Sequence, residues 1–283
     1  MRFPRILAAI RSTPWAALPS TVHALHAAVI AAAAGRDRHR ADMGDSIAEP
    51  NPPPEPAYDI SPDGVAVIPV RGIIGKHLST METMCGGYDL DTLAPALAAS
   101  AADPRVRERV LFIDSPGGTC TGVPEAFAAV RLSAEIKPVF GFTDSQACSA
   151  AQWIASACDR FAITTSATVG SVGVYCALVD ESAAWAKDGY RLELVKAGTQ
   201  KAAGIAGAPI TADDVAGFQR NVDTIYGMFI ADVRTGRGVV DDAVLQGQTF
   251  MGHAAVDVNL ADDVVTDLAD LLAQIVAARG PGK

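Results

Sequence analysis

Strand-like and helix-like segments alternate along most of this chain, and this alternation restricts its fold more than any other feature. Residues 64–72, 109–115 and 137–144 are apolar runs of strand length, and residues 90–103 and 123–134 between them have helical patterns. Strands that alternate with helices at this spacing form parallel β-α units. The sequence therefore predicts an α/β domain, in which ligands bind beyond the carboxyl ends of the strands.

The same alternation continues toward the C-terminus. We expect strands at 160–165, 171–179 and 190–198, and helices at 149–158, 181–189 and 211–234. Upstream, residues 43–60 hold five prolines and several acids. This composition favours neither helix nor strand, so it predicts an extended linker. The linker divides a basic helical N-terminal arm or propeptide (1–42) from a body at 61–283.

The distribution of charge limits the partners of the chain. The net charge is −9, which argues against nucleic-acid binding by the whole surface, yet residues 1–40 hold six Arg and one Asp.

The apolar run Val22–Ala34 contains two histidines and is shorter than the ~20 residues that span a bilayer. An amphipathic docking helix is favoured over a signal peptide or an anchor. The five cysteines include no C-x-x-C pair, which favours reduced thiols and no zinc site.

Two segments follow predicted strands and carry candidate chemistry. In the first, Asp114–Gly118, a buried strand ends in Pro-Gly-Gly before a helix, and such a turn can direct backbone N–H groups at an oxyanion. A tight turn that needs glycine for its φ angles explains the same residues. In the second, Ser149 begins a helix of small residues, where the helix N-terminus stabilises an anion. A plain N-cap serine explains Ser149 equally, and its neighbour Cys148 is typical of a buried small residue.

A hydroxyl nucleophile needs a general base, and the histidines supply none at a convincing position. Between His77 and His253 the sequence has no histidine, and neither of these two is in a setting that favours catalysis. Ser-Lys variants of the catalytic triad exist, and a lysine serves as the base when burial lowers its pKa. Two lysines follow the predicted strand 190–198 closely, namely Lys196 and Lys201.

Taken together, these segments resemble the signal-peptide peptidase A family of Ser-Lys serine proteases, and within it the branch of phage and prophage capsid-maturation proteases. The resemblance covers about residues 64–270 and rests on five segments. They are "LFIDSPGG", "ACSAAQWIASACD", "ATVGSVGVYCALVD", "LELVKAGTQKAAG" and "QGQTFMGHAAVDVNLADDV". It implies a ClpP/crotonase-like spiral of β-β-α units, a serine endopeptidase without metal or cofactor, and assembly into homo-oligomeric rings. It also implies protein or peptide substrates, such as capsid, scaffold or portal proteins, in the host cytoplasm or a procapsid.

The resemblance also assigns roles to individual residues. Ser149 lies at the nucleophile position, and Lys201 at the position of the base, three residues after Gly198. Gly117, Gly118 and Ala150 correspond to the oxyanion-binding backbone, and Ser171 to a residue that orients the base. In single-domain members of the family the serine and the lysine of one site come from neighbouring subunits, which would make an isolated monomer inactive.

The chain departs from the family pattern at three places. Two alanines follow the serine where bacterial members often have glycines, and Asn259 replaces a late glycine. Asn tolerates the left-handed conformation that such a glycine adopts. We expect no membrane anchor of the kind that a signal-peptide-degrading enzyme has, which argues against that role, and the alanines are typical of the phage branch.

Several alternative functions fit the same fold. A bacterial signal-peptide-degrading peptidase shares the dyad, and a ClpP-type peptidase would need a histidine soon after Ser149. A crotonase-type acyl-CoA enzyme uses the same oxyanion architecture without a serine nucleophile. A non-catalytic capsid-assembly protein would keep the fold and lose the chemistry.

Overall fold

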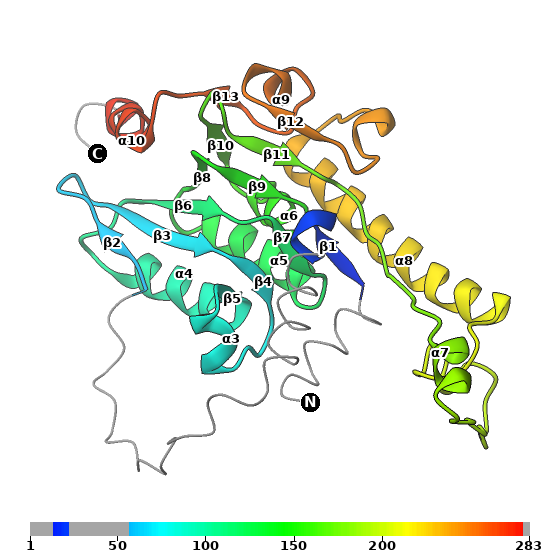
Figure 1. The fold of residues 1–283 in the computed structure, drawn as a ribbon. Helices are drawn as coiled ribbons and strands as arrows, with labels where there is room; N and C mark the ends of the chain where they lie inside the picture. Colours follow the sequence, from blue (N-terminus) through cyan, green and yellow to red (C-terminus); the bar gives the residue numbers. More distant parts are fainter. Residues whose placement is uncertain (1–13, 23–56, 280–283) are drawn as a thin grey trace, which may run out of the picture.

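A six-stranded sheet runs through the body of the computed structural model, which describes residues 14–22 and 57–279 (Figure 1). The predicted arm (1–42) and linker (43–60) therefore lie largely outside the described residues. In spatial order the strands are β13 (Asp263–Val264), β10 (Arg160–Ile163), β8 (Val139–Thr143), β6 (Glu108–Asp114), β3 (Val65–Arg71) and β2 (Asp59–Ile60). The first five are parallel to their neighbours, and β2 is antiparallel to β3.

Shorter strands form two further sheets next to the large one. The first holds, in order, β1 (Trp15–Ala17), β7 (Gly117–Thr119), β4 (Ile73–Gly75) and β5 (Gly87–Asp89). The second holds β12 (Thr249–Met251), β11 (Thr168–Gly170) and β9 (Gln146–Cys148). A parallel bridge joins Ala147 of β9 to Ser115, which lies between β6 and β7.

The chain visits these layers in a repeating order of long strand, short strand and helix. The helices are α3 (Thr80–Met84), α4 (Leu93–Ala102), α5 (Val123–Ala134), α6 (Ala150–Ala155), α7 (Ser182–Lys187), α8 (Ala212–Arg237), α9 (His253–Asp257) and α10 (Leu268–Ala277). Short 3-10 turns span Leu90–Thr92 and Asp242–Val244. Thus β3 and β4 lead to α4, β6 and β7 to α5, and β8 and β9 to α6. The predicted α/β class and the spiral of β-β-α units are both confirmed by this topology.

Both faces of the large sheet are covered, which explains why its strands are almost continuously apolar. On β6, Leu111 belongs to the main core with α4, α5 and α6, whereas Val110 packs toward Leu271 and Ile275 of α10 on the other face. The alternation of successive side chains between the two faces of a strand produces this division.

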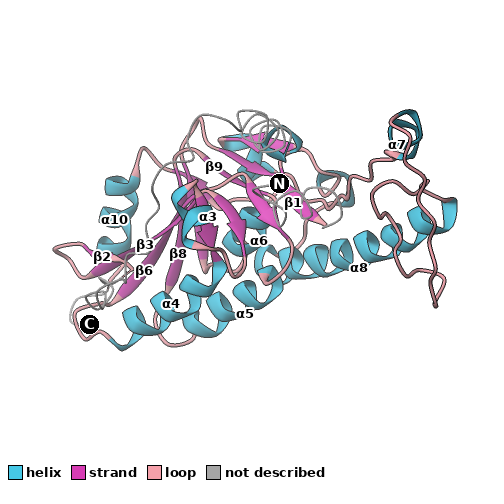
Figure 2. Cartoon of the chain, turned by 60° about the horizontal axis from the view of Figure 1, so that its bottom comes forward, coloured by secondary structure: helices cyan, strands magenta, loops and turns pink. Residues whose placement is uncertain are grey.

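The long helix α8 carries part of the chain away from the sheets (Figure 2). Its C-terminal half packs on the body, where Phe229 stacks on Trp153 with ring centroids 4.4 Å apart. Its N-terminal half projects outward together with α7 and the segment between them. Within residues 14–22 and 57–279, every helix is too short or too polar to cross a membrane.

Two predicted strands are absent from the described structure. Residues 190–198 form no strand, because they lie on the projecting part, where no sheet edge runs beside them. Residues 171–179 form only a single bridge, from Tyr175 to Trp15. In both cases the strand-like pattern has no partner along its length, and a strand needs a paired neighbour to form.

Arg109 connects the middle of α4 to the C-terminal end of α5 from inside the core. Its guanidinium is fully buried and donates to the carbonyl oxygens of Leu97 (3.3 Å), Ser133 (2.6 Å) and Lys137, and to the Ser133 hydroxyl. Burial lowers the pKa of Arg109 from its ordinary value, but these acceptors satisfy most of its donors.

We expect Arg109→Ala to lower the free energy of unfolding by about 3–5 kcal/mol, because it leaves buried carbonyls without a donor and opens a cavity. Urea denaturation followed by circular dichroism measures this loss. Arg131→Ala, which removes an exposed arginine from α5, should cost less than about 0.5 kcal/mol. Equal effects of the two variants would contradict the structural role of Arg109.

Candidate active site

Ser149 occupies a strained turn between β9 and α6. Its φ and ψ are 57° and −117°, a conformation that non-glycine residues rarely adopt and that often marks a functional site. Its backbone N–H donates to Gly170 O (2.7 Å), and its carbonyl accepts from Trp153 N–H (2.9 Å) at the start of α6. The main chain therefore fixes this residue from both sides.

The Ser149 hydroxyl is buried and without a hydrogen-bond partner among the described residues. The residue is 1% exposed, and its Oγ neither caps α6 nor contacts another polar atom. The N-cap interpretation of Ser149 is therefore wrong, because a capping serine would accept a bond from the helix backbone. A buried hydroxyl without a partner is costly, and such an unsatisfied group is typical of a site prepared for a ligand or a reaction.

Cys148, beside Ser149, has the features of a packing residue. It is fully buried, its Sγ contacts Thr168 O at 3.6 Å, and burial raises the pKa of its thiol to about 12. Because the thiolate is the reactive form of cysteine, Cys148 is not a nucleophile at neutral pH.

The glycine turn predicted from the sequence lies directly against Ser149. A Cβ added to Gly117, whose φ is +98°, would lie 2.9 Å from Ser149 Cβ and 2.9 Å from Cys148 O. A Cβ on Gly118 would lie 1.8 Å from Ile74 O. Ser115 shapes the turn, since its hydroxyl accepts from Gly117 N–H (3.2 Å) and donates to Gly72 O (2.7 Å). Both glycines are therefore required by close approach of the backbone.

Two more of the predicted site residues lie beside the serine. Ala150 is fully buried as the first residue of α6. Ser171 follows Gly170, the acceptor of the Ser149 N–H, and has a φ of 54°. Its own backbone N–H donates to Gln248 O (2.6 Å). The structure thus brings together Ser149, both turn glycines, Ala150 and Ser171.

The comparisons with known proteins are consistent with this geometry. The family model "Peptidase family S49" matches residues 131–277, which include Ser149 and Lys201. The chain belongs to peptidase family S49. Head-tail preconnector protein GP5 of Enterobacteria phage P21 is 31% identical over 205 residues, which cover 72% of this chain and 41% of that protein. Capsid assembly protease C of Escherichia phage lambda is 29% identical over 221 residues, which cover 77% of this chain and 50% of that protein.

The chain thus spans about half the length, or less, of these two relatives. Among solved structures, an enoyl-CoA hydratase/isomerase of the crotonase type from Legionella pneumophila matches with a TM-score of 0.45 and 17% identity, covering 78% of this chain and 73% of that chain.

Lys201, the base that the resemblance to S49 peptidases implies, lies apart from Ser149 within one chain. It is exposed on the projecting part, where it lines a surface pocket together with Gln200, Ala202 and Phe218. Figures 1 and 2 show this part at the far end of α8 from α6. Within a single chain, the structure therefore does not bring Lys201 to Ser149.

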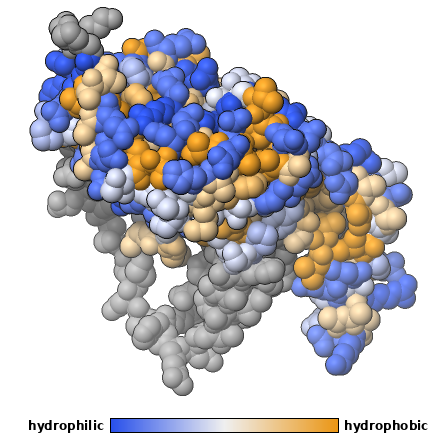
Figure 3. Space-filling view, turned by 90° about the horizontal axis from the view of Figure 1, so that it is seen from above, coloured by the Kyte–Doolittle hydropathy of each residue, from blue (hydrophilic) through white to orange (hydrophobic). Residues whose placement is uncertain are grey.

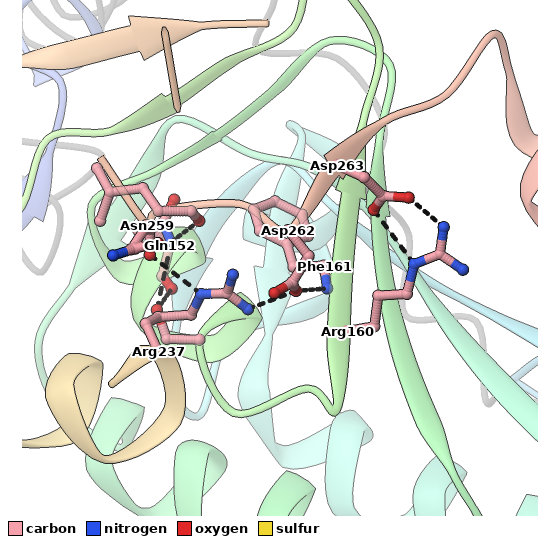
Figure 4. A network of polar contacts seen from close by, with 9 residues as sticks. Gln152, Arg160, Phe161, Arg237, Asn259, Asp262 and Asp263 are labelled. Atoms are coloured by element: carbon pink, nitrogen blue, oxygen red, sulfur yellow. Dashed lines mark hydrogen bonds and ion pairs between the residues drawn. The ribbon is translucent and has the colours of Figure 1, made fainter. Parts of the chain in front are cut away.

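Sequence reasoning missed Gln152, which supports the nucleophile turn from within α6 (Figure 4). Its fully buried amide accepts from Gly170 N–H (3.1 Å) and donates to Leu260 O (3.0 Å). Gly170 in turn accepts from Ser149, so Gln152 positions the strand that holds the serine. The sequence did contain a signal for this role: Gln152 is a single amide residue among small apolar residues, one helical turn after Ser149.

Polar contacts hold the late segment 259–262 against the C-terminal end of α8 and the strand β10. Asp262 accepts from Arg237 (2.6 Å) and from the Phe161 N–H (2.6 Å), and the Asn259 carbonyl accepts from Arg237 (3.3 Å) (Figure 4). Asn259 has a φ of 61°, which confirms the left-handed conformation expected where this chain departs from the glycine of the family pattern.

Proposed function

We propose that this S49 chain is a serine endopeptidase with a Ser149–Lys201 dyad, and that it cleaves capsid or scaffold proteins during phage assembly. The observation that carries the proposal is Ser149 itself, a buried and unpartnered hydroxyl in a strained strand-to-helix turn against Gly117. The similarity to a head-tail preconnector protein and a capsid assembly protease of phages supports the substrate class. On this proposal residues 61–283 are the peptidase domain, and the site of action is the host cytoplasm or a procapsid.

In the proposed reaction, neutral Lys201 removes the proton from Ser149 Oγ, which attacks a peptide carbonyl and forms an acyl-enzyme. Backbone N–H groups at Gly118 and Ala150 stabilise the oxyanion, each contributing about 2.7–4 kcal/mol in comparable enzymes, whereas the Gly117 N–H donates to the Ser115 hydroxyl and shapes the turn. Ser171 orients the lysine amine. Protonated Lys201 gives the proton taken from Ser149 to the amine leaving group as the peptide C–N bond breaks. It then accepts a proton from the water that attacks the acyl-enzyme and returns it to Ser149 Oγ as the ester bond breaks.

The separation of Lys201 from Ser149 supports a site shared between two copies of the chain. The projecting part exposes large apolar side chains that a monomer leaves in water, and Figure 3 shows apolar surface gathered there. They are Val179, Tyr190, Leu194, Val195, Ile205 and Val215. Exposed apolar patches of this kind mark contact surfaces. Seated on a neighbour in a ring, the projecting part delivers Lys201 to the neighbour's Ser149.

Mixing two inactive variants tests the proposed peptidase and its shared site together. Ser149→Ala and Lys201→Ala are each expected to be inactive alone. After co-refolding in equal amounts, about a quarter of the sites combine an intact serine with an intact lysine from another copy, as expected of random symmetric assembly. Cleavage of a capsid or scaffold protein added to the refolded mixture, read by mass spectrometry, should recover to about a quarter of the wild-type rate. No recovery would contradict the shared site.

A further inference from the structure

The N-terminal strand β1 lies outside the matched S49 region and makes an unusual set of contacts. It pairs antiparallel with β7 in the register Trp15 to Thr119, Ala16 to Gly118 and Ala17 to Gly117. The pairing extends beyond the strand, because Leu18 N–H donates to Pro116 O (3.1 Å) and Cys120 N–H donates to Pro14 O (3.4 Å). The whole segment 14–18 therefore follows the glycine turn beside Ser149 (Figure 1).

The opposite edge of this segment is hydrogen-bonded as well. Trp15 N–H donates to Tyr175 O (2.8 Å), and Tyr175 N–H donates to Trp15 O (3.0 Å). Residues 14–18 thus lie between β7 and the segment after Gly170, in a gap that one extended chain fills. Main-chain bonds on both edges are the way in which proteins bind extended peptides by strand addition.

This occupied gap lies at the nucleophile. The carbonyl oxygen of Ala16 would lie 2.2 Å from a Cβ on Gly117, and Ser149 Cβ lies 2.9 Å from the same point. Ala16 is fully buried, and Ser149 is 1% exposed. A serine that attacks peptides must meet its substrate, so a segment that covers it has to leave before any substrate enters.

The side chains of the segment match their positions. Small Ala16 and Ala17 lie where the backbone approaches the glycine turn most closely, and they are 0% and 4% exposed. Trp15, 3% exposed, packs in a separate cluster with Val22, Ile73 and Tyr175 and anchors the segment. A large anchor next to small residues is an arrangement typical of a bound peptide.

We infer that residues 14–18 are an internal occupant of the substrate groove, which keeps the peptidase inactive until the segment is displaced. The inference rests on the proposed function and extends it. It assigns the groove between β7 and Tyr175 to extended peptides, with small side chains next to Ser149. Because the occupant is part of the same chain, its effective concentration is far above that of a free peptide of equal affinity.

Trp15→Asp in the full-length protein tests this inference, since a buried charge expels the anchor. Labelling of Ser149 by a fluorophosphonate should rise at least about tenfold, because reactivity follows the fraction of open molecules. Ser20→Asp places the same charge on an exposed residue of the same segment and should leave labelling unchanged. Trp15→Ala is a milder second variant if Trp15→Asp does not fold, as judged by circular dichroism.

A binding measurement separates failure of this inference from failure of the proposed function. A fluorescent peptide of residues 14–22 should bind to Ser149→Ala/Trp15→Asp, and at least about tenfold more weakly to Ser149→Ala alone, whose groove is occupied. Binding without any Ser149 labelling in Trp15→Asp supports the groove and contradicts the nucleophile. Measurable labelling that is equal in folded Trp15→Asp, Trp15→Ala and wild type, or equal peptide binding to both serine variants, overturns the inference.

Discussion

Replacement of Ser149 by alanine should reduce the rate of peptide cleavage by at least about 10³-fold, because the acyl-enzyme no longer forms. Lys201→Ala should cause a loss of similar size, since residues that act as one catalytic unit lose nearly everything when either is removed. Initial rates on a fluorogenic peptide measure both losses. They are best measured in wild-type and Trp15→Asp backgrounds, so that the N-terminal segment does not mask them.

Cys148→Ala is the matched control for the serine. It lies next to Ser149 in the chain and is equally buried, but its thiol remains protonated because burial raises its pKa to about 12. We expect Cys148→Ala to keep cleavage within about threefold of wild type, because only packing changes. Full activity of Ser149→Ala, or loss of activity in a folded Cys148→Ala, would contradict the assignment of the nucleophile.

Gly117→Ala should also abolish cleavage, for a different reason. Its φ of +98° strains any side chain, and the new methyl group would meet Ala16 O at 2.2 Å and both Cys148 O and Ser149 Cβ at 2.9 Å. Displacing β1 relieves the first contact and leaves the other two. The turn must therefore shift away from the serine, and loss of oxyanion alignment costs about 10²–10³-fold in rate.

Gly238→Ala separates the effect of crowding from the effect of the positive φ. Gly238 has a φ of +76°, and a Cβ there meets nothing within 4 Å. It should lower stability by about 1–2 kcal/mol, the cost of the backbone conformation, and leave kcat unchanged. Thermal denaturation and initial rates measure the two effects. Equal activity of Gly117→Ala and Gly238→Ala would contradict a role of the Gly117 turn in catalysis.

Much of the fold followed from local patterns. The strands ending at Asp114 and Thr143 and the helix over Val123–Ala134 were readable because apolar periodicity depends on short stretches of chain. The pattern at 190–198 was misleading for the same reason: it records which residues suit a strand, whereas the strand itself needs a neighbouring edge.

The sequence alone determined the alternation of strands and helices, the glycine turn and the position of Ser149 at the start of a helix. These features depend on residues close together in the chain and on glycines at positions where a side chain would collide with the backbone. The tertiary structure decided two others: the N-terminal segment lies in the groove at Ser149, and Lys201 lies away from that serine. The first depends on pairing between segments about a hundred residues apart, and the second on the way the chain around α7 projects from the body. Neither leaves a periodic signal in a single sequence.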